Sequence, residues 1–311
     1  MRKRWELKNK DSDAARALGG MSGLHPLIGR ILVARGIVAP EEASRFLAPS
    51  LSAMHDPHLL RGMAAAVDRL VAARRNHETV CIYGDYDVDG ITATALLVSF
   101  LRAAGVECRY FIPNRFDDGY GLNTDALERI IALGAGLIVS VDCGITAVAE
   151  ALFCRERGVD LIIVDHHSPR ETIPDASAVL NPLQPGCGYP YKSLAGVGVA
   201  FNLLIALRAA LRNQGAFGEG GEPDLREWLD LVALGTIADV VQLTGQNRIY
   251  AFHGLKQLSS SAKPGIQALK WVADVTGNVT CGQVGFRLGP RLNAAGRMES
   301  ALPGVDLLLS E

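Results

Sequence analysis

Residues 79–97 read TVCIYGDYDVDGITATALL, a short apolar segment that runs into a cluster of acids and then into a second apolar segment. The first five residues are hydrophobic and β-branched, which predicts a buried strand. Three aspartates follow it at alternate positions: Asp85, Asp87 and Asp89. Ligands of parallel α/β sheets bind at the carboxyl ends of the strands. This stretch therefore predicts a strand, a helix and a functional edge between them.

The same alternation of strand and helix continues downstream. We predict, in order, helix 63–76, strand 79–83, helix 91–104, strand 107–112, helix 124–133, strand 136–141, helix 146–157 and strand 160–164. Short apolar strands alternating with helices of this length are typical of a parallel sheet that is buried on both faces. The predicted fold class is α/β, with a doubly wound, mainly parallel sheet flanked by helices.

The regions on either side of this pattern are predicted to be helical. The predicted domains are a small helical preamble over 1–60, with a helix starting at Pro40, a metal-binding α/β domain over 61–245, and a helical connector with one short break over 246–311. Inside the central domain we also expect helix 193–212, a polar glycine-rich loop over 214–223, and a helix over 224–234 that ends at Gly235.

Composition bounds the function. The 311 residues carry a net charge of −2, so a nucleic-acid partner would have to be held by a local groove or by metals. No stretch approaches the ~18 consecutive apolar residues of a membrane helix. The six cysteines include no CxxC pair, which favours reduced side chains over a disulfide or zinc framework. We expect a soluble cytoplasmic enzyme without a membrane partner.

Acidic side chains follow three of the predicted strands. Besides the first cluster, Asp142 follows the strand ending at 141, and Asp165-His166-His167 follows the strand ending at 164. Asp239 comes just after a helix end. Carboxylates with one or two imidazoles suit Mn²⁺ or Mg²⁺. The pattern predicts a site for two ions and a phosphodiesterase, with Asp142 on the middle strand as the bridging ligand.

Each acid also has an ordinary explanation. Aspartate after a strand is often a turn former or a helix N-cap, and Asp89-Gly90 by itself is typical of a turn. The Asp165-His166-His167 triplet follows four apolar residues, and charged groups at a buried strand end need partners. Because all the clusters fall on one edge of the sheet, the metal site is the better interpretation.

Two further segments are expected to face the substrate. Residues 113–122 offer Arg115 for a phosphate and Tyr120 for stacking on a base, although a turn with a buried aromatic would also explain them. Residues 289–297 contain two arginines that could bind phosphate, among small residues that allow close approach of the backbone. The alternative is that the two arginines are a surface pair that caps a helix. The candidates in this second segment are Arg291, Asn293 and Arg297.

Six strings of this sequence resemble the motifs of the DHH phosphoesterase superfamily, and within it the bacterial single-stranded-DNA-specific 5′→3′ exonucleases. They are GDYDVDGITATALL (84–97), PNRFDDGYGL (113–122), SVDCGIT (140–146), KSLAGVGVAF (192–201), ALGTIADVVQL (233–243) and GPRLNAAGR (289–297). The resemblance implies hydrolysis of single-stranded DNA from a 5′ end with two Mn²⁺ or Mg²⁺ ions, in DNA repair and recombination. It also implies cooperation with a helicase and a single-strand-binding protein.

The resemblance further implies a role for each residue. The metal ligands would be Asp87, Asp89, Asp142, His166 and Asp239, with Asp85 as a ligand or its support. Asp142, Asp165, His166 and His167 would form the catalytic set. Within it, Asp165 would orient a histidine, and His167 would donate to the scissile phosphate. Arg297, and with it Arg291, would face the 5′ phosphate or the DNA backbone.

The sequence departs from the family in length. The family continues into a second domain, termed DHHA1, and an oligonucleotide-binding fold, whereas this chain stops at Glu311 after leucines 307–309, which we expect to be exposed. A truncated, weakly active fragment is therefore one expectation. The alternative functions are a phosphodiesterase for short oligonucleotides or cyclic dinucleotides, and a catalytically silent DNA-binding scaffold. The scaffold would be expected to have lost metal ligands.

Overall fold

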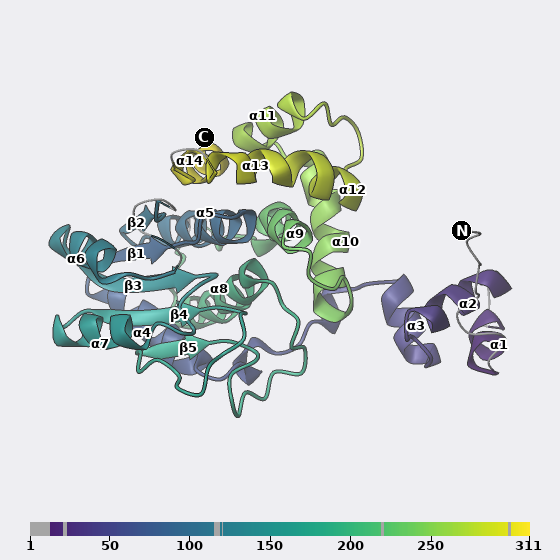
Figure 1. Ribbon diagram of the computed structural model, residues 1–311, viewed down its shortest axis with the longest axis horizontal. Helices are drawn as coiled ribbons and strands as arrows, with labels where there is room; N and C mark the ends of the chain where they lie inside the picture. Colours follow the sequence, from purple (N-terminus) through teal and green to yellow (C-terminus); the bar gives the residue numbers. More distant parts are fainter. Residues whose placement is uncertain (1–12, 21–23, 115–118, 120, 219–220, 298–299) are drawn as a thin grey trace, which may run out of the picture. The chain divides into compact units, whose positions relative to one another are not determined.

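The computed structural model describes residues 13–20, 24–114, 119, 121–218, 221–297 and 300–311, and it divides the chain into two compact units, Met1–Met54 and His55–Glu311 (Figure 1). The first unit contains α1 (Asp13–Gly19), α2 (Pro26–Ala34), α3 (Pro40–Leu47) and a 3₁₀ turn, η1 (Leu51–Ala53). Leu18, Leu32 and Ala43 form part of its small core. The predicted helix start at Pro40 is confirmed.

The second unit is built on a five-stranded sheet in which every pairing is parallel. The strands lie in the order β2-β1-β3-β4-β5, with bounds β1 Thr79–Tyr83, β2 Cys108–Phe111, β3 Ala135–Val141, β4 Asp160–Val164 and β5 Ala178–Leu180. The predicted α/β fold with a parallel sheet is confirmed. β3 is the middle strand, and its Ser140 lies opposite both Tyr83 of β1 and Ile163 of β4.

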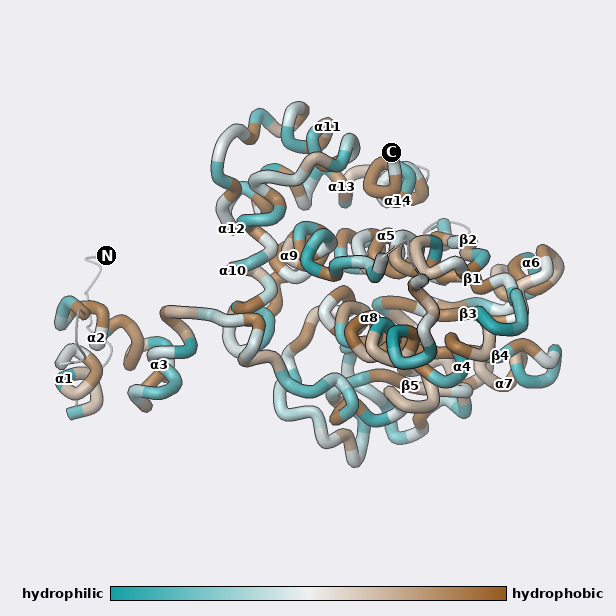
Figure 2. Tube along the Cα trace, turned by 180° about the vertical axis from the view of Figure 1, so that it is seen from behind, coloured by the Kyte–Doolittle hydropathy of each residue, from teal (hydrophilic) through white to brown (hydrophobic). Residues whose placement is uncertain are grey.

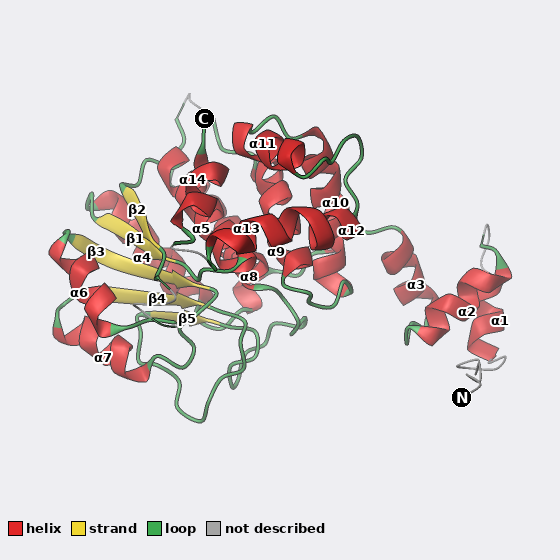
Figure 3. Ribbon diagram, turned by 45° about the horizontal axis from the view of Figure 1, so that its top comes forward, coloured by secondary structure: helices red, strands yellow, loops and turns green. Residues whose placement is uncertain are grey.

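Helices cover both faces of the sheet (Figure 3). One face carries α4 (Met63–Arg75), α5 (Val88–Ala103) and α8 (Gly196–Asn213), and the other carries α6 (Thr124–Ala132) and α7 (Val148–Glu156). Alternate residues of each strand face opposite sides, so Ile138 joins the core under α6 and α7, whereas Val139 faces the other layer. In Figure 2 the central strands run through this unit as hydrophobic segments.

Further helical elements complete the second unit. A short 3₁₀ turn, η2 (Pro57–Leu59), lies near its start, and the elements after α8 are η3 (Leu225–Trp228), α9 (Leu229–Ala238), α10 (Gly245–Ser260), α11 (Pro264–Val272), α12 (Cys281–Gln283), the π-helix η4 (Val284–Leu288), α13 (Gly289–Ala295) and α14 (Leu302–Leu309). No helix among the described residues is long and apolar enough to cross a membrane.

Several predicted boundaries were wrong. The helix expected to end at Gly235 starts later and continues to Ala238, because Gly235 packs inside the unit against Thr92 of α5. The described residues of the region 246–311 show three breaks between helices rather than one, and the first of them precedes Pro264. β5 was not predicted, because its three residues are too few to show a pattern. The domain boundaries proposed at 60 and 245 stay predictions.

The leucines of α14 are not exposed as expected. Leu308 is buried, and Leu307 and Leu309 are partly buried. The helix packs against α5 and α11, and Gly304 is in close contact with Ile91. These contacts give the leucines an ordinary role in packing.

Candidate metal centre

The loop after β1 is held by its own aspartates. Asp87 is the N-cap of α5, and its Oδ1 accepts hydrogen bonds from the N–H groups of Asp89 (2.8 Å) and Gly90 (3.1 Å). A Cβ on Gly90 would lie 2.7 Å from the Cβ of Asp85, so only glycine allows this tight turn. The cap therefore starts the helix at Val88 and directs Asp85, Asp87 and Asp89 to the same edge of the sheet.

Asp142 follows the middle strand in an unusual backbone conformation. Its φ is +61°, its N–H donates to the Val164 carbonyl (2.9 Å), and the residue is 1% exposed. Positive φ in a non-glycine residue is uncommon and often marks a functional site. The strained turn places a buried carboxylate at the centre of the edge.

Asp165 follows β4 and is surrounded by donors. Its Oδ1 accepts from the backbone N–H groups of His166 (2.7 Å) and His167 (3.1 Å) and contacts His167 Nδ1 (2.8 Å). Its Oδ2 accepts from the N–H of Ile145 (2.9 Å). Burial acts to raise the pKa of Asp165, but the hydrogen bonds and charge of His167 and the N–H of Ile145 lower it below its usual value. Asp165 is thus an ionised carboxylate that orients His167.

The amino terminus of α8 fixes Asp89. Asp89 Oδ2 accepts from the N–H of Gly196 (2.6 Å) and Oδ1 from the N–H of Val197 (2.9 Å). A helix amino terminus favours a negative charge. A Cβ on Gly196 would lie 2.6 Å from Asp142 Oδ1, so the close approach of α8 also requires glycine. Our sequence reasoning missed this role, although the string Gly196-Val197-Gly198 was its signal.

His166 is the imidazole at the centre of the cluster. Its Nε2 lies 3.1 Å from Asp142 Oδ1, 3.7 Å from Asp239 Oδ2 and 3.8 Å from Asp89 Oδ2. Burial, and then the charge of His167, lower the pKa of His166, which leaves its ring neutral at neutral pH. A neutral imidazole nitrogen facing carboxylates is the state in which histidine binds a metal.

Three buried atoms of this cluster have no hydrogen-bond partner among the described residues: Asp142 Oδ1, His166 Nε2 and Asp239 Oδ2. Buried polar atoms normally have partners. These three face one another, and a cation between them would satisfy all of them. Three sets of ligand atoms each lie within 4.8 Å of one another: Asp85, Asp87 and Asp142; Asp89, His166 and Asp239; and Asp142, His166 and His167. The donor set fits hard divalent cations such as Mn²⁺ or Mg²⁺.

The carboxylates repel one another without a cation. Burial, and then the charge of Asp87, raise the pKa of Asp85 to about 7. Burial, and again Asp87, raise the pKa of Asp239 to about 6. The pKa values of Asp89 and Asp142 are raised well above the usual value, first by burial and then by neighbouring carboxylates. Protons therefore occupy part of this cluster when no cation is bound.

His167 differs from His166 in charge. Its hydrogen bond to Asp165 raises the pKa of His167 to about 8, so the ring is largely protonated at neutral pH. Its side chain is 45% exposed. A protonated imidazole cannot ligate a metal, but it can donate to an anion in the adjacent solvent.

The segment 289–297 lies against the acidic loops. Asn293 Oδ1 accepts from the N–H of Val88 (3.0 Å), and a Cβ on Gly296 would lie 2.5 Å from the carbonyl oxygen of Tyr86. The side chains of Arg291 and Arg297 are exposed. Asn293 therefore helps to position α5, and its predicted role toward the substrate stays a prediction. Arg115 and Tyr120 lie outside the described residues.

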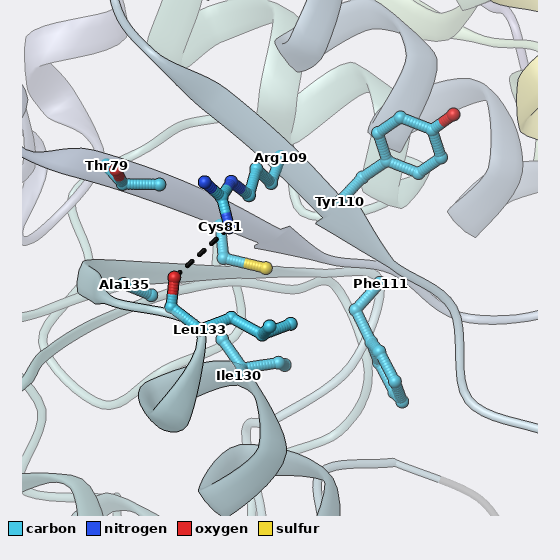
Figure 4. A pocket seen from close by; sticks show the side chains of 8 residues that line it. All are labelled: Thr79, Cys81, Arg109, Tyr110, Phe111, Ile130, Leu133 and Ala135. Atoms are coloured by element: carbon cyan, nitrogen blue, oxygen red, sulfur yellow. Dashed lines mark hydrogen bonds between the residues drawn. The ribbon is translucent and has the colours of Figure 1, made fainter.

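A pocket elsewhere on the sheet has no part in this cluster. Figure 4 shows it between β1, β2, β3 and α6, with Arg109 donating to the Leu133 carbonyl (3.1 Å). Thr79 and Ala135 in its wall are the first residues of their strands. None of the acidic residues of the cluster lines this pocket.

The metal-free protein is expected to lose stability as the pH rises from about 5 to about 8. Folding raises the pKa of Asp85 to about 7 and of Asp239 to about 6. Below these values the folded state retains protons that the unfolded chain has released. By linkage the free energy of unfolding then falls with rising pH. Thermal unfolding of EDTA-treated protein measures this dependence.

The Asp85→Asn variant is the control for this effect. Its asparagine side chain at position 85 cannot ionise, so the melting temperature of the variant should depend less on pH than that of the unaltered chain. The repulsion described for the cluster would be contradicted if the melting temperature of the unaltered, metal-free chain rose between about pH 5 and about pH 8.

Comparison with known proteins is consistent with this geometry. The family model "DHH family, N-terminal domain" matches residues 79–236, which is just over half of the chain. The chain therefore belongs to the DHH family. Among its relatives is the single-stranded-DNA-specific exonuclease RecJ of Bacillus subtilis (strain 168), which is 43% identical over 309 residues, 99% of this chain and 38% of that protein. RecJ of Dickeya dadantii (strain 3937) is 46% identical over 92% of this chain and 50% of that protein.

Solved structures of RecJ share the fold. RecJ of Thermus thermophilus in complex with Mn²⁺ is 33% identical, with a TM-score of 0.79 over 98% of this chain and 42% of that one. Exonuclease RecJ bound to manganese is 37% identical, with a TM-score of 0.73 over 84% of this chain and 63% of that one. The chain spans about 40–50% of the length of the two curated relatives, from Bacillus subtilis and Dickeya dadantii.

Proposed function

We propose that this chain carries the metal centre of a single-stranded-DNA-specific 5′→3′ exonuclease that acts in DNA repair and recombination. The observation that carries the proposal is the convergence of three unpartnered buried atoms, from Asp142, His166 and Asp239, at the carboxyl edge of the sheet. The similarity to RecJ proteins over most of this chain supports the substrate class.

Two ions, Mn²⁺ or Mg²⁺, would be held by two sets of residues. Asp85, Asp87 and Asp142 form one set, and Asp89, His166 and Asp239 form the other. Bound divalent ions of this kind supply a water of lowered pKa and a clamp for the phosphoryl oxygens. Asp142 lies between the two sets, since its Oδ1 is also 3.1 Å from His166 Nε2. It is the best candidate for a ligand shared by both ions.

His167 would stabilise charge on the scissile phosphate. Its ring is held by Asp165, its pKa is raised to about 8 by that contact, and nearly half of the side chain is exposed to solvent. Such a preorganised donor acts most strongly where negative charge develops in the reaction. The exposed guanidinium groups of Arg291 and Arg297 would bind the phosphates of the strand.

The proposal is tested with single-stranded DNA labelled at its 5′ end. We expect Mn²⁺-dependent release of labelled mononucleotides, no release in the presence of EDTA, and little hydrolysis of duplex DNA of the same sequence. A dinucleotide is the matched control substrate. Turnover of the dinucleotide without any hydrolysis of long strands would instead indicate a phosphodiesterase for short oligonucleotides. The absence of all hydrolysis by protein that binds Mn²⁺ would contradict the proposal.

Two further expectations stay proposals. A cytoplasmic location follows from the proposed role in DNA repair. Cooperation with a helicase and a single-strand-binding protein would supply the unwound strand that the enzyme requires.

A further inference from the structure

An exposed aromatic side chain lies in η4, the π-helix that precedes α13. Phe286 lies in η4 and is 86% exposed, whereas Val284 and Leu288 on either side of it are fully buried. Burying the ring would stabilise the fold, so packing does not explain an aromatic residue at this position. A π-helix inserted between α-helices often marks a functional site.

The segment that carries this ring lies near Asp239 in the fold. η4 packs against α9, the helix whose last residue, Ala238, precedes Asp239. A Cβ on Gly289, the residue after η4, would lie 3.2 Å from the Cβ of Ala238. Phe286 is therefore three residues before Gly289, and Gly289 contacts the residue that precedes the candidate ligand Asp239.

A second exposed side chain flanks the same contact. Val240 is also 86% exposed, and its φ is +63°, a strained value for a β-branched residue. Val240 and Phe286 have the largest exposed fractions among the large hydrophobic side chains of the described residues. Strain that exposes an apolar group next to a ligand points to a function at that place.

A cation accompanies the two apolar side chains. Arg291 is exposed, and its guanidinium folds back to donate to the carbonyl of Arg287 (2.8 Å), the residue next to Phe286. An aromatic ring together with a guanidinium group is the combination that binds single-stranded nucleic acid, through base stacking and phosphate contact. The charge of Arg291 and the adjoining phosphodiester site favour this occupant over an apolar protein surface.

We propose that Phe286, together with the exposed Val240, is a stacking platform for an unpaired base of the strand held at the metal centre. The proposal rests on the proposed function and adds a residue that contacts the base rather than the phosphate. Because every base has a π-face, the platform would bind single strands with little preference for sequence.

The test measures binding of the 311-residue chain to oligonucleotides with phosphorothioate linkages, which resist hydrolysis. Fluorescence anisotropy compares a thymidine strand with an abasic strand of the same length. The variants are Phe286→Ala, Phe286→Leu and Phe286→Trp. The matched control is Trp271→Ala, since Trp271 is also exposed (83%) but lies on α11.

We expect Phe286→Ala to weaken binding of the thymidine strand about 5- to 100-fold and to leave abasic binding unchanged. Phe286→Leu should lose most of this affinity, because it keeps the apolar volume but not the ring. Phe286→Trp and Trp271→Ala should bind like the unaltered chain.

Two outcomes would overturn the platform while leaving the exonuclease proposal intact. One is unchanged thymidine binding by Phe286→Ala. The other is an equal loss for both strands, which would indicate that Phe286 supports the fold and does not contact a base. If the unaltered chain binds neither strand, the proposed function itself fails, and the platform fails with it.

Discussion

Replacing Asp142 with asparagine is expected to reduce Mn²⁺-dependent hydrolysis of single-stranded DNA by a factor on the order of 10³ or more, because the bound ions supply much of the transition-state stabilisation. Each ~1.4 kcal/mol of lost stabilisation lowers the rate about tenfold. Asp142 belongs to one of the two proposed ion sets, and its Oδ1 lies 3.1 Å from His166 Nε2 of the other set. This Oδ1 has no hydrogen-bond partner among the described residues. Asparagine has nearly the same shape but lacks the charge. Both ions would therefore lose a ligand.

The same variant should fold at least as well as the unaltered chain without metal. Burial and the neighbouring carboxylates raise the pKa of Asp142 well above its usual value, so an uncharged side chain relieves repulsion. The melting temperature of EDTA-treated protein should stay equal or rise, and added Mn²⁺ should stabilise the variant less. Full activity with normal Mn²⁺ binding would show that Asp142 is not a ligand.

Replacing Gly196 with alanine is expected to weaken Mn²⁺ binding about 10- to 100-fold and hydrolysis about 100-fold. The new Cβ would lie 2.6 Å from Asp142 Oδ1 and 3.0 Å from its Cγ. The first turn of α8 also donates to both oxygens of Asp89. Either α8 or Asp142 must move. A shift of α8 would disturb Asp89, and a shift of Asp142 would displace a candidate ligand directly.

Gly198→Ala is the matched control for this prediction. Gly198 lies in the same helical turn, but its nearest neighbours, atoms of Leu194 and Tyr250, would be 3.4 Å from the new Cβ. The control should bind Mn²⁺ normally and fold equally well or slightly better, since alanine favours helix. Isothermal titration with Mn²⁺ compares the two variants. Equal affinity in both would mean that α8 does not constrain Asp142.

The ligands that follow strands could be predicted because the parallel fold itself brings strand ends together. Asp142 comes directly after the short apolar strand β3, and His166 is the second residue after β4. The sheet therefore places both residues at one edge, whatever the details of packing. The structure brings together all eight predicted residues of the metal and catalytic sets. Their individual roles stay predictions.

The contacts that depend on distant helices could not be predicted. The hydrogen bond between Asp89 and Gly196 joins residues 107 positions apart, and it exists only because α8 points its first turn at the end of β3. The same holds for Gly235, which local rules assign to a helix end but which packs against Thr92 inside the unit. The exposure of Phe286 likewise depends on how η4 packs on α9.

The most direct test of the metal centre is anomalous scattering from Mn²⁺ in crystals of this chain. We predict two peaks at the carboxyl edge of the sheet, one among Asp85, Asp87 and Asp142 and one among Asp89, His166 and Asp239, with Asp142 contacting both. Crystals of Asp142→Asn provide the control and should show weaker peaks. The absence of any peak at this edge, or Mn²⁺ bound only elsewhere on the chain, would contradict the account.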